Sequence, residues 1–262
     1  MSVELYKKRV IRRKIITHVL QITLLIGFLG LWELLANKGI LNEFLFSKPS
    51  AIYDLLKNYI LSGEIYQHLK ISIYETVLGL VIGTILGLVI AIGLWANKFI
   101  AKLLDPFLVV LNALPKTALA PIFIIWAGTG VKGIVVVAVS ISLIVTILSA
   151  YSYFNNVSEE KIKMLRSFGA SKFQILTKLI LPSNIANIMG IIKINIGMSW
   201  IGVIVGEFIV SRAGIGYLLT YGSQIFRLDL VMMSVVVLAI VAYLMYLITT
   251  FIEKQLLKMY NK

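Results

Sequence analysis

Four runs of this chain contain no charged residue over 18 positions or more, and this feature constrains its fold more than any other. The runs are Ile15–Trp32, Thr76–Asn97, Gly133–Ser158 and Leu230–Ile252. A helix needs about 20 apolar residues to cross the roughly 30 Å hydrocarbon core of a bilayer. Only 14% of the 262 residues are charged, whereas soluble domains have about 25%. The runs therefore predict four membrane-spanning helices.

Two further apolar stretches, Phe107–Gly128 and Ile188–Ser211, are long enough to span but contain residues that lipid does not accommodate. These residues are Pro115, Lys116 and Pro121 in the first stretch, and Lys193 and Glu207 in the second. Prolines and ionisable groups persist at membrane depth where protein or a water-filled cavity surrounds them. We therefore expect both stretches to face the inside of a bundle, which gives an all-α polytopic membrane protein with six transmembrane helices.

The basic residues predict how the six spans are oriented. Sixteen of the 25 Lys and Arg residues lie on the side shared by both termini, and seven lie on the other side. Because cytoplasmic segments carry the excess of Lys and Arg, both termini are predicted to be cytoplasmic, in a cell membrane. The net charge of +13 is then explained by span ends that meet anionic lipid, and no nucleic-acid partner is expected. With no cysteine and two distant histidines, neither a metal nor a cofactor is expected.

We divide the chain into two parts, an N-terminal part over residues 1–66 and a core over residues 67–262. The first part holds a basic arm, the first span and an amphipathic segment after Pro49, which either lies on the outer membrane surface or docks an external partner. The core holds the other five spans. Its first span carries Gly79, Gly83 and Gly87 at four-residue spacing, which favours close packing within the chain over a subunit interface.

The core also contains one compact polar loop, residues 158–182. Ser158 and two acids after it favour the start of a short helix, and Gly169 is typical of a helix end in left-handed conformation. Ser171 and Gln174 have the spacing of a capping box for a second short helix, with an apolar stripe that begins at Phe173. Pro182 is expected to end the unit, since proline disfavours helical geometry in the preceding residue, Leu181. These residues alone fit a simple connector as well as a docking element.

A resemblance to a known family separates those two interpretations. The loop resembles the cytoplasmic coupling loop of binding-protein-dependent ABC importer permeases, in which Glu-Ala-Ala is followed after three residues by Gly and later by Ile-x-Leu-Pro. Gly169, Leu181 and Pro182 match at the family spacing, whereas Lys163, Met164 and Leu165 stand at the Glu-Ala-Ala positions. The segments "FSKPSAIYDLL", "LLDPFLVVLNALPKTALAPIFIIWAGTG" and "WIGVIVGEFIVSRAGIGYLL" resemble the nitrate/sulfonate/taurine (bicarbonate) importer group.

The resemblance implies a type I ABC importer permease fold with cytoplasmic coupling helices, and it implies partners. Those partners are a second permease copy as a homodimer, two cytoplasmic ABC ATPase subunits and an external solute-binding protein. This chain has no G-x-x-x-x-G-K-[ST] phosphate loop, so ATP hydrolysis is assigned to a separate subunit and the chain itself is not expected to be an enzyme. The residues expected to couple to the ATPase are Lys163, Leu165, Gly169, Ala170, Ser171, Phe173, Gln174, Leu181 and Pro182.

Several polar or kinking residues in the spans are candidates for a transport pathway or gate: Asn112, Pro115, Lys116, Pro121, Trp200 and Glu207. Glu207 either lines the pathway or forms a structural ion pair with Lys193 or Lys116. The two prolines either expose carbonyl groups to a cavity or kink a helix to fit the bundle. Glu75 is expected near a span end, within reach of the interface.

The predicted function is that of a permease subunit that moves a small polar solute, such as a sulfonate, taurine or nitrate, by alternating access. A secondary, ion-coupled transporter without an ATPase is the alternative, and it predicts inverted repeats that this chain does not contain. A membrane scaffold with no transport role would not need broken, charged spans.

Overall fold

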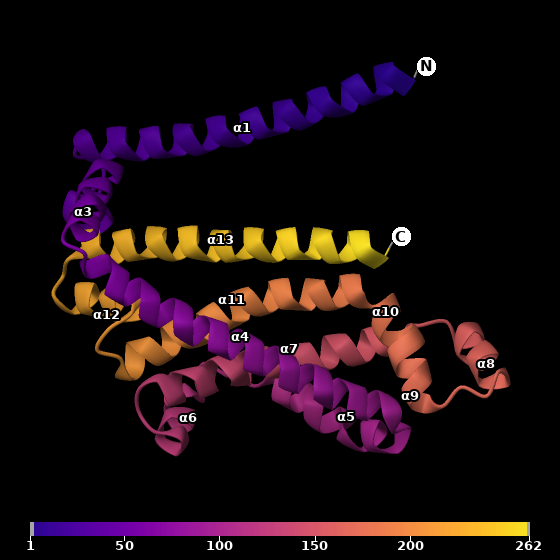
Figure 1. Cartoon of the computed structure of the whole chain (residues 1–262). Helices are drawn as coiled ribbons and strands as arrows, with labels where there is room; N and C mark the ends of the chain where they lie inside the picture. The colour runs from indigo at the N-terminus through magenta and orange to yellow at the C-terminus, as the bar shows by residue number, and fades with distance from the viewer. Residues whose placement is uncertain (1–2, 261–262) are drawn as a thin grey trace. The chain divides into compact units, whose positions relative to one another are not determined.

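The computed structural model describes residues 3–260, which form helices joined by short turns (Figure 1). The first half holds α1 (Val3–Asn37), α2 (Glu43–Phe46), α3 (Pro49–Leu61), α4 (Glu64–Ala96), α5 (Lys98–Ala113), α6 (Ala120–Ala127) and α7 (Val131–Asn155). The second half holds α8 (Glu159–Ser167), α9 (Lys172–Ile175), the π-helix η1 (Leu176–Ile180), α10 (Leu181–Ser183), α11 (Ile185–Val210), α12 (Ile215–Gln224) and α13 (Leu228–Tyr260). Residues 1–2 and 261–262, at the ends of the two predicted parts, lie outside the described residues.

Five helices within the described residues are long and apolar enough to cross a membrane, namely α1, α4, α7, α11 and α13. They correspond to five of the six predicted spans. Helices α1 and α4 each begin 12 residues before their charge-free runs, and α7 ends three residues before its run does. The all-α membrane architecture predicted from the runs is confirmed.

The remaining predicted span, Phe107–Gly128, is divided between α5 and α6. Leu114 is extended, with φ −66° and ψ 135°, as expected for a residue that precedes a proline. Pro121 lies in the first turn of α6, where its missing N–H costs no hydrogen bond. At about 1.5 Å per residue, neither helix alone crosses a bilayer. This predicted span is therefore two short helices, with Pro115 in the break between them and Pro121 in the first turn of the second.

The chain forms two compact units, and the first is the smaller. It comprises Met1–Ser62, of which residues 3–62 are described, together with Tyr221–Met233. The Trp32 indole N–H donates to the carbonyl of Ser47 (3.3 Å), and Glu33 accepts hydrogen bonds from the backbone N–H and the hydroxyl of Ser50. These bonds fasten the start of α3 to α1. The amphipathic segment after Pro49 is thus a helix of 13 residues, too short to span.

The second unit, Gly63–Thr220 with Ser234–Lys262, has α4, α7 and α11 packed together at its centre. A Cβ atom added at Gly79 would stand 2.6 Å from Ala138 Cβ, and one at Gly87 would stand 2.5 Å from Thr146 Cβ. An added Cβ at Gly83 would overlap Ser142, also on α7. The glycine stripe is therefore a packing surface within the chain, as predicted, because small residues let helix backbones approach closely.

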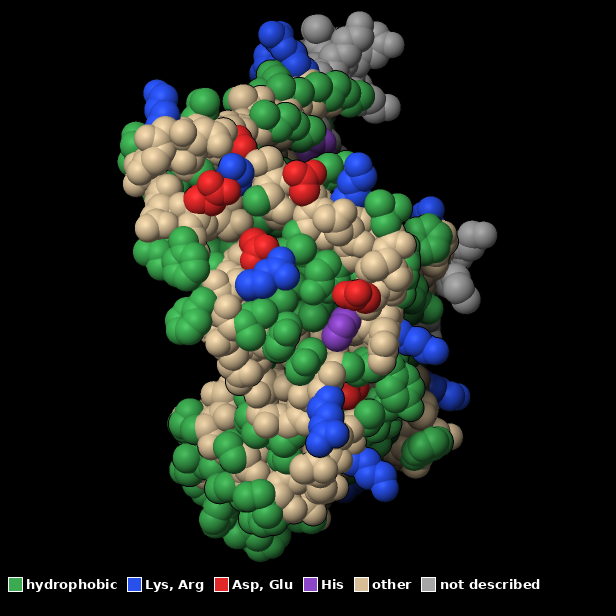
Figure 2. All heavy atoms as spheres, turned by 90° about the vertical axis from the view of Figure 1, so that its left-hand side faces the viewer, with side chains coloured by type: hydrophobic (Ala, Val, Ile, Leu, Met, Phe, Trp, Pro, Cys, Tyr) green, Lys and Arg blue, Asp and Glu red, His purple; other side chains and the backbone are tan. Residues whose placement is uncertain are grey.

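Buried polar side chains also join these three helices. The Asn195 amide on α11 donates to Thr84 Oγ1 on α4 (2.8 Å) and to Thr146 Oγ1 on α7 (2.7 Å). All three side chains are buried. The outward surface is instead apolar, and hydrophobic side chains cover broad areas of the face drawn in Figure 2. Such an exterior around a polar-bonded interior fits a lipid environment.

Candidate functional site

The 158–182 loop follows α7 and leads into α11, and its first helix, α8, begins where the sequence predicted. Ser158 occupies the N-cap position, but its side chain makes no capping hydrogen bond. Glu159 and Glu160 lie in the first turn, where acids are favourable to the helix dipole. Lys163 pairs with Glu159 across one turn at 3.7 Å, and both side chains are exposed. The predicted hydroxyl cap is thus absent from α8, which begins with acids alone.

Gly169 ends α8 in left-handed conformation, with φ +77°. Its N–H donates to the Arg166 carbonyl (2.9 Å), and the Ala170 N–H donates to the Leu165 carbonyl (3.0 Å). This bond pair is a Schellman motif, in which side chains at the positions of Leu165 and Ala170 commonly touch. Both of these side chains pack against the same apolar cluster. No atom lies within 4 Å of a Cβ added at Gly169, so its backbone conformation alone calls for glycine.

The predicted capping box is present at the start of α9. Ser171 Oγ accepts from the Gln174 N–H (3.2 Å), and Gln174 Oε1 accepts from the Ser171 N–H (2.8 Å). The end of α8 and the start of α9 are therefore each closed by hydrogen bonds between residues three to five positions apart. The turn between α8 and α9 is defined by local sequence.

Pro182 does not end the loop's second helical segment, contrary to the prediction. Leu181 is helical, with φ −65° and ψ −48°, and the chain remains helical from α9 through η1 into α10. A proline in a helix lacks one N–H, and its ring collides with the carbonyl four residues earlier. The wider π turn over Leu176–Ile180 changes this spacing just ahead of the proline. The segment ends instead at Asn184, whose amide donates to the Ile180 carbonyl at 2.9 Å.

The two faces of the 158–182 loop differ in burial. Ile175, Leu176 and Ile180 are buried in a cluster with residues from the ends of α4, α7 and α11. In contrast, Phe168 is 80% exposed and Phe173 is 72% exposed. The predicted apolar stripe is therefore divided: Leu176 and Ile180 are buried together with Ile175, whereas Phe173 points away from the core. The loop is seated firmly on the helical core and presents two aromatic rings outward.

At the opposite end of α11, Glu207 organises the turn into α12, which we call the 207–217 turn. Glu207 is 1% exposed. Its Oε1 accepts from the Ser72 hydroxyl on α4 (2.5 Å), and its Oε2 accepts from the Gly216 N–H (2.5 Å). Ser72 Oγ accepts in turn from the Ile215 N–H at 2.8 Å. The carboxylate thus satisfies backbone donors at the start of α12, where a helix leaves N–H groups unpaired.

Two glycines and a histidine complete the 207–217 turn. The Gly214 N–H donates to His68 Nδ1 (3.0 Å), and the His68 ring stacks on Tyr217 with 5.9 Å between centroids. A Cβ atom added at Gly216 would stand 2.8 Å from Glu207 Cβ, and one at Gly214 would overlap the Glu207 carboxylate. Only glycine permits this approach of backbone to carboxylate.

The structural ion pair considered for Glu207 is not formed. Lys193 pairs with Glu253 at 2.5 Å, and the Lys116 ammonium donates to the Asn112 carbonyl at 3.0 Å. Glu75, which we expected near the interface, is 1% exposed and shares a hydrogen bond with Glu207. Its Oε2 has no hydrogen-bond partner in the described part of the chain. A hydrogen bond between two carboxyl groups requires one proton between them, which explains how both remain buried without a cation.

The other pathway candidates lie in different surroundings. Asn112, Pro115 and Pro121 are exposed around the break between α5 and α6, and Lys116 is half-buried there. Trp200 is buried on α11, and its indole N–H has no partner among the described residues. The structure therefore brings Asn112 and Lys116 into contact, whereas Trp200 and Glu207 are enclosed in the helical core.

Sequence reasoning did not identify Ser72 or Glu75 as partners of Glu207, or His68 as the partner of Gly214. The only local signal was the Gly-Ile-Gly sequence at residues 214–216, which follows Glu207 by seven residues. Their pairing joins positions at least 132 residues apart, and a single sequence gives no indication of such a contact.

Comparison with known families and proteins gives consistent matches. Residues 79–259 match the family model described as "Binding-protein-dependent transport system inner membrane component". The chain is 30% identical over 234 residues to the putative aliphatic sulfonates transport permease protein SsuC of Bacillus subtilis (strain 168), covering 89% of this chain and 84% of that protein. It is 24% identical over 236 residues to the taurine transport system permease protein TauC of Escherichia coli (strain K12), covering 87% and 86%.

A solved structure shares the fold. An inward facing conformation of the MetNI methionine ABC transporter matches with a TM-score of 0.59 at 17% identity, covering 76% of this chain and 94% of that one. At this identity the match concerns the arrangement of helices.

Proposed function

This chain belongs to the family of binding-protein-dependent transport system inner membrane components, and on this premise we propose that it is the permease subunit of an ATP-driven importer. The solute is a small polar molecule delivered by an external binding protein, of the sulfonate, taurine or nitrate class. The names of the sulfonate and taurine relatives support this class. ATP hydrolysis belongs to cytoplasmic ABC ATPase subunits, and the chain moves the solute by alternating access.

The observation that carries this proposal is the two-faced 158–182 loop. Its inner face is fixed to the ends of α4, α7 and α11, and its outer face holds Phe168 and Phe173 in solvent. Exposed aromatic rings on a rigid support are typical anchors of protein interfaces. We assign this outer face to the ATPase contact, with Lys163 and Gln174 beside it and the Schellman and capping-box residues holding its shape. Leu181 and Pro182 connect it to α11.

The assembly we propose contains two copies of this permease, as a homodimer, and two ATPase subunits. Both termini lie in the cytoplasm, on the side of the 158–182 loop. Within unit 2, the C-terminal end of α13 and the loop lie at the same end of the helices (Figure 1), which supports this orientation. The basic residues at that end support it as well.

In this proposal the solute passes beside the broken helix pair α5–α6, where Asn112, Pro115, Lys116 and Pro121 offer polar groups and freed carbonyls. Glu207 acts as a positioning residue that fixes the 207–217 turn, and Trp200 packs within the same helix. Exposed Asn112 and half-buried Lys116 are the polar groups that support a pathway there.

The test is solute uptake into vesicles that contain the chain, its cognate ATPase and the external binding protein. We expect taurine or an alkanesulfonate to accumulate only with ATP inside the compartment that holds the ATPase. Native mass spectrometry of the purified assembly is expected to show two permease and two ATPase copies. Uptake that needs no ATP and follows an ion gradient would instead identify a secondary transporter.

A further inference from the structure

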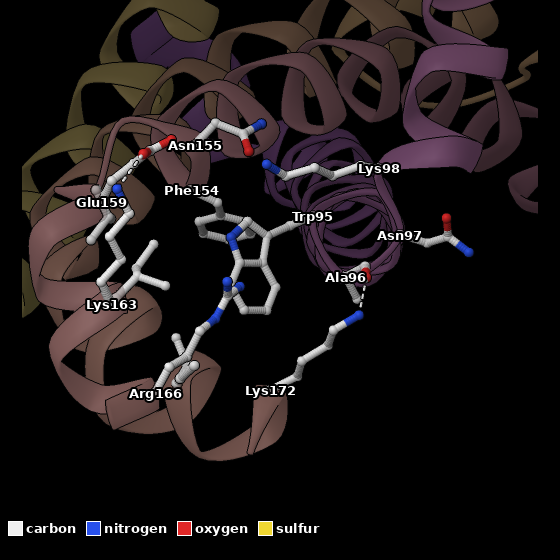
Figure 3. A pocket seen from close by; sticks show the side chains of 13 residues that line it. Trp95, Ala96, Asn97, Lys98, Phe154, Asn155, Glu159, Lys163, Arg166 and Lys172 are labelled. Carbon is white, nitrogen blue, oxygen red and sulfur yellow. Dashed lines mark hydrogen bonds and ion pairs between the residues drawn. The ribbon is translucent and has the colours of Figure 1, made fainter. Parts of the chain in front are cut away.

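A cavity of about 880 Å³ lies between the 158–182 loop and the helical core. It is enclosed by the end of α4, the start of α5, the end of α7, and helices α8 and α9 (Figure 3). Trp95, Phe154 and Ile175 form its apolar wall. Phe168 and Phe173, the exposed rings assigned to the ATPase contact, are not among its lining residues. The cavity is therefore separate from these two rings, and Lys163 is the residue that lies both beside the outer face and in the cavity lining.

Four cations and one carboxylate line this cavity: Lys98, Lys163, Arg166, Lys172 and Glu159. Figure 3 shows the Arg166 guanidinium extended toward Trp95 and the Lys172 ammonium turned toward the end of α4. Glu159 is engaged by Lys163 at 3.7 Å, and Lys172 makes a long bond of 3.4 Å to the Ala96 carbonyl. In the described part of the chain, the side chains of Lys98 and Arg166 have no hydrogen-bond or ion-pair partner. The cavity thus holds a positive charge that the protein itself leaves unbalanced.

Because two candidate membrane spans end at this cavity, we expect it to lie where hydrocarbon gives way to lipid headgroups. Two candidate membrane spans, α4 and α7, end at Ala96 and Asn155, and both of these residues are at its rim. Trp95 lies one residue inside the end of α4, at the level where tryptophan concentrates in membrane proteins. A ligand in this cavity therefore faces the headgroup layer.

Exposed apolar side chains follow Lys98 along α5. Phe99 immediately follows Lys98, and its side chain is 76% exposed; Leu103, one turn further along α5, is also exposed. A molecule whose charged group occupied the cavity would have a hydrophobic surface beside it for its chains. This combination of cations, interfacial depth and adjoining apolar surface fits an amphiphilic anion better than a water-soluble one.

We propose that this cavity binds the phosphate group of an anionic membrane phospholipid, with Lys98 and Arg166 as its principal ligands. Basic pockets between helices at the membrane surface recognise anionic headgroups through charge and hydrogen bonds. Arginine supplies a planar fork that matches two phosphate oxygens. The bound lipid fills the space between the core and the 158–182 loop and supports the loop from behind. This inference goes beyond the proposed function and does not depend on an ATPase or a particular solute.

The test uses native mass spectrometry of the full chain in detergent, titrated with phosphatidylglycerol, phosphatidylcholine or inorganic phosphate. We expect phosphatidylglycerol to bind most tightly. The double variant Lys98→Gln with Arg166→Gln is expected to weaken that binding by about tenfold or more, since each cation contributes to anionic lipid attraction. The matched control, Lys161→Gln with Lys178→Gln, removes the same charge from exposed positions of the loop that do not line the cavity.

A second measurement needs no charge substitution. Phosphatidylglycerol brominated near the headgroup is expected to quench Trp95 fluorescence, measured as the difference between the natural chain and Trp95→Phe. Equal loss of lipid binding in both double variants, or no quenching of Trp95, would overturn the site. Binding of inorganic phosphate in place of the lipid would overturn the membrane source of the phosphate. All these readouts are independent of solute uptake, so their failure is distinguishable from failure of the proposed function.

Discussion

The 158–182 loop and the 207–217 turn stand at opposite ends of α11, and they keep their shapes by different means. The loop is closed by bonds between neighbours: Ala170 to Leu165, Gly169 to Arg166, and Ser171 with Gln174. The turn is closed by bonds to α4, at Ser72 and His68, and these partners are more than 130 positions away in sequence. Gly169, Ser171 and Gln174 of the loop are exposed, and Leu165 and Ala170 are half-buried. In the turn, Glu207 and Ser72 are buried and His68 is half-buried.

The loop and the turn therefore differ in what keeps each of them rigid. A turn held by local bonds keeps its form whether or not its surroundings move, which suits the ATPase contact that we propose for it. A turn held by buried long-range bonds keeps its form only while α4 and α11 remain in register. The following predictions test that division, from the largest expected effect on folding stability to the smallest.

Removing the Glu207 carboxylate is expected to have the largest effect on stability. Glu207→Ala leaves the Ser72 hydroxyl and the Gly216 N–H without their buried acceptor, at about 1–3 kcal/mol for each unsatisfied group. The measurement is thermal unfolding of the purified chain in detergent. Glu159→Ala, in an exposed pair on the loop, is the control and is expected to cost well under about 1 kcal/mol. Similar losses from the two variants would remove the distinction between the two ends of α11.

A methyl group added at Gly216 is expected to have the next largest effect. The new Cβ would stand 2.8 Å from both Glu207 Cβ and Glu207 Oε2, and 3.0 Å from the Ile204 carbonyl oxygen. Such overpacking costs about 1–3 kcal/mol. Gly190→Ala on α11 is the matched control, because no atom lies within 4 Å of its added Cβ. That control is expected to raise the unfolding temperature slightly, since alanine favours helix by up to about 1 kcal/mol. A lower unfolding temperature for Gly190→Ala than for Gly216→Ala would contradict the packing described for the turn.

Of the three substitutions, Gly169→Val is expected to change folding stability least and the interaction with the ATPase most. A β-branched residue at φ +77° is strained by about 1–2 kcal/mol, but the strain is confined to the exposed loop. The chain is expected to insert and fold, yet to lose ATPase co-purification and solute-stimulated hydrolysis in vesicles. Gly169→Asn, which tolerates the left-handed conformation, is expected to retain much of both. If Gly169→Val retained both activities, the loop would be only a connector.

The same division explains what the sequence revealed and what it did not. The Gly169 conformation and the Ser171–Gln174 box were predictable because each depends on residues within five positions. The prediction that Pro182 ends the helical segment was wrong, because the π turn before it is set by the packing of Leu176 and Ile180 on the core. Glu207 was recognised as unusual in an apolar stretch, but the ion pair considered for it, with Lys193 or Lys116, is not formed. Glu75 was misplaced for a related reason: its neighbours in sequence do not show that α11 covers it.

The length of α11 means that a small tilt of this helix moves its two ends by a large distance. Its 26 residues form an unbroken helix of about 39 Å between the loop and the turn. Over that length, a tilt of about 5° displaces one end relative to the other by about 3 Å. A hydrogen bond does not survive a displacement of that size. A small rotation imposed at the loop would therefore be sufficient to separate Glu207 from Ser72, with no signal passed from residue to residue along the way.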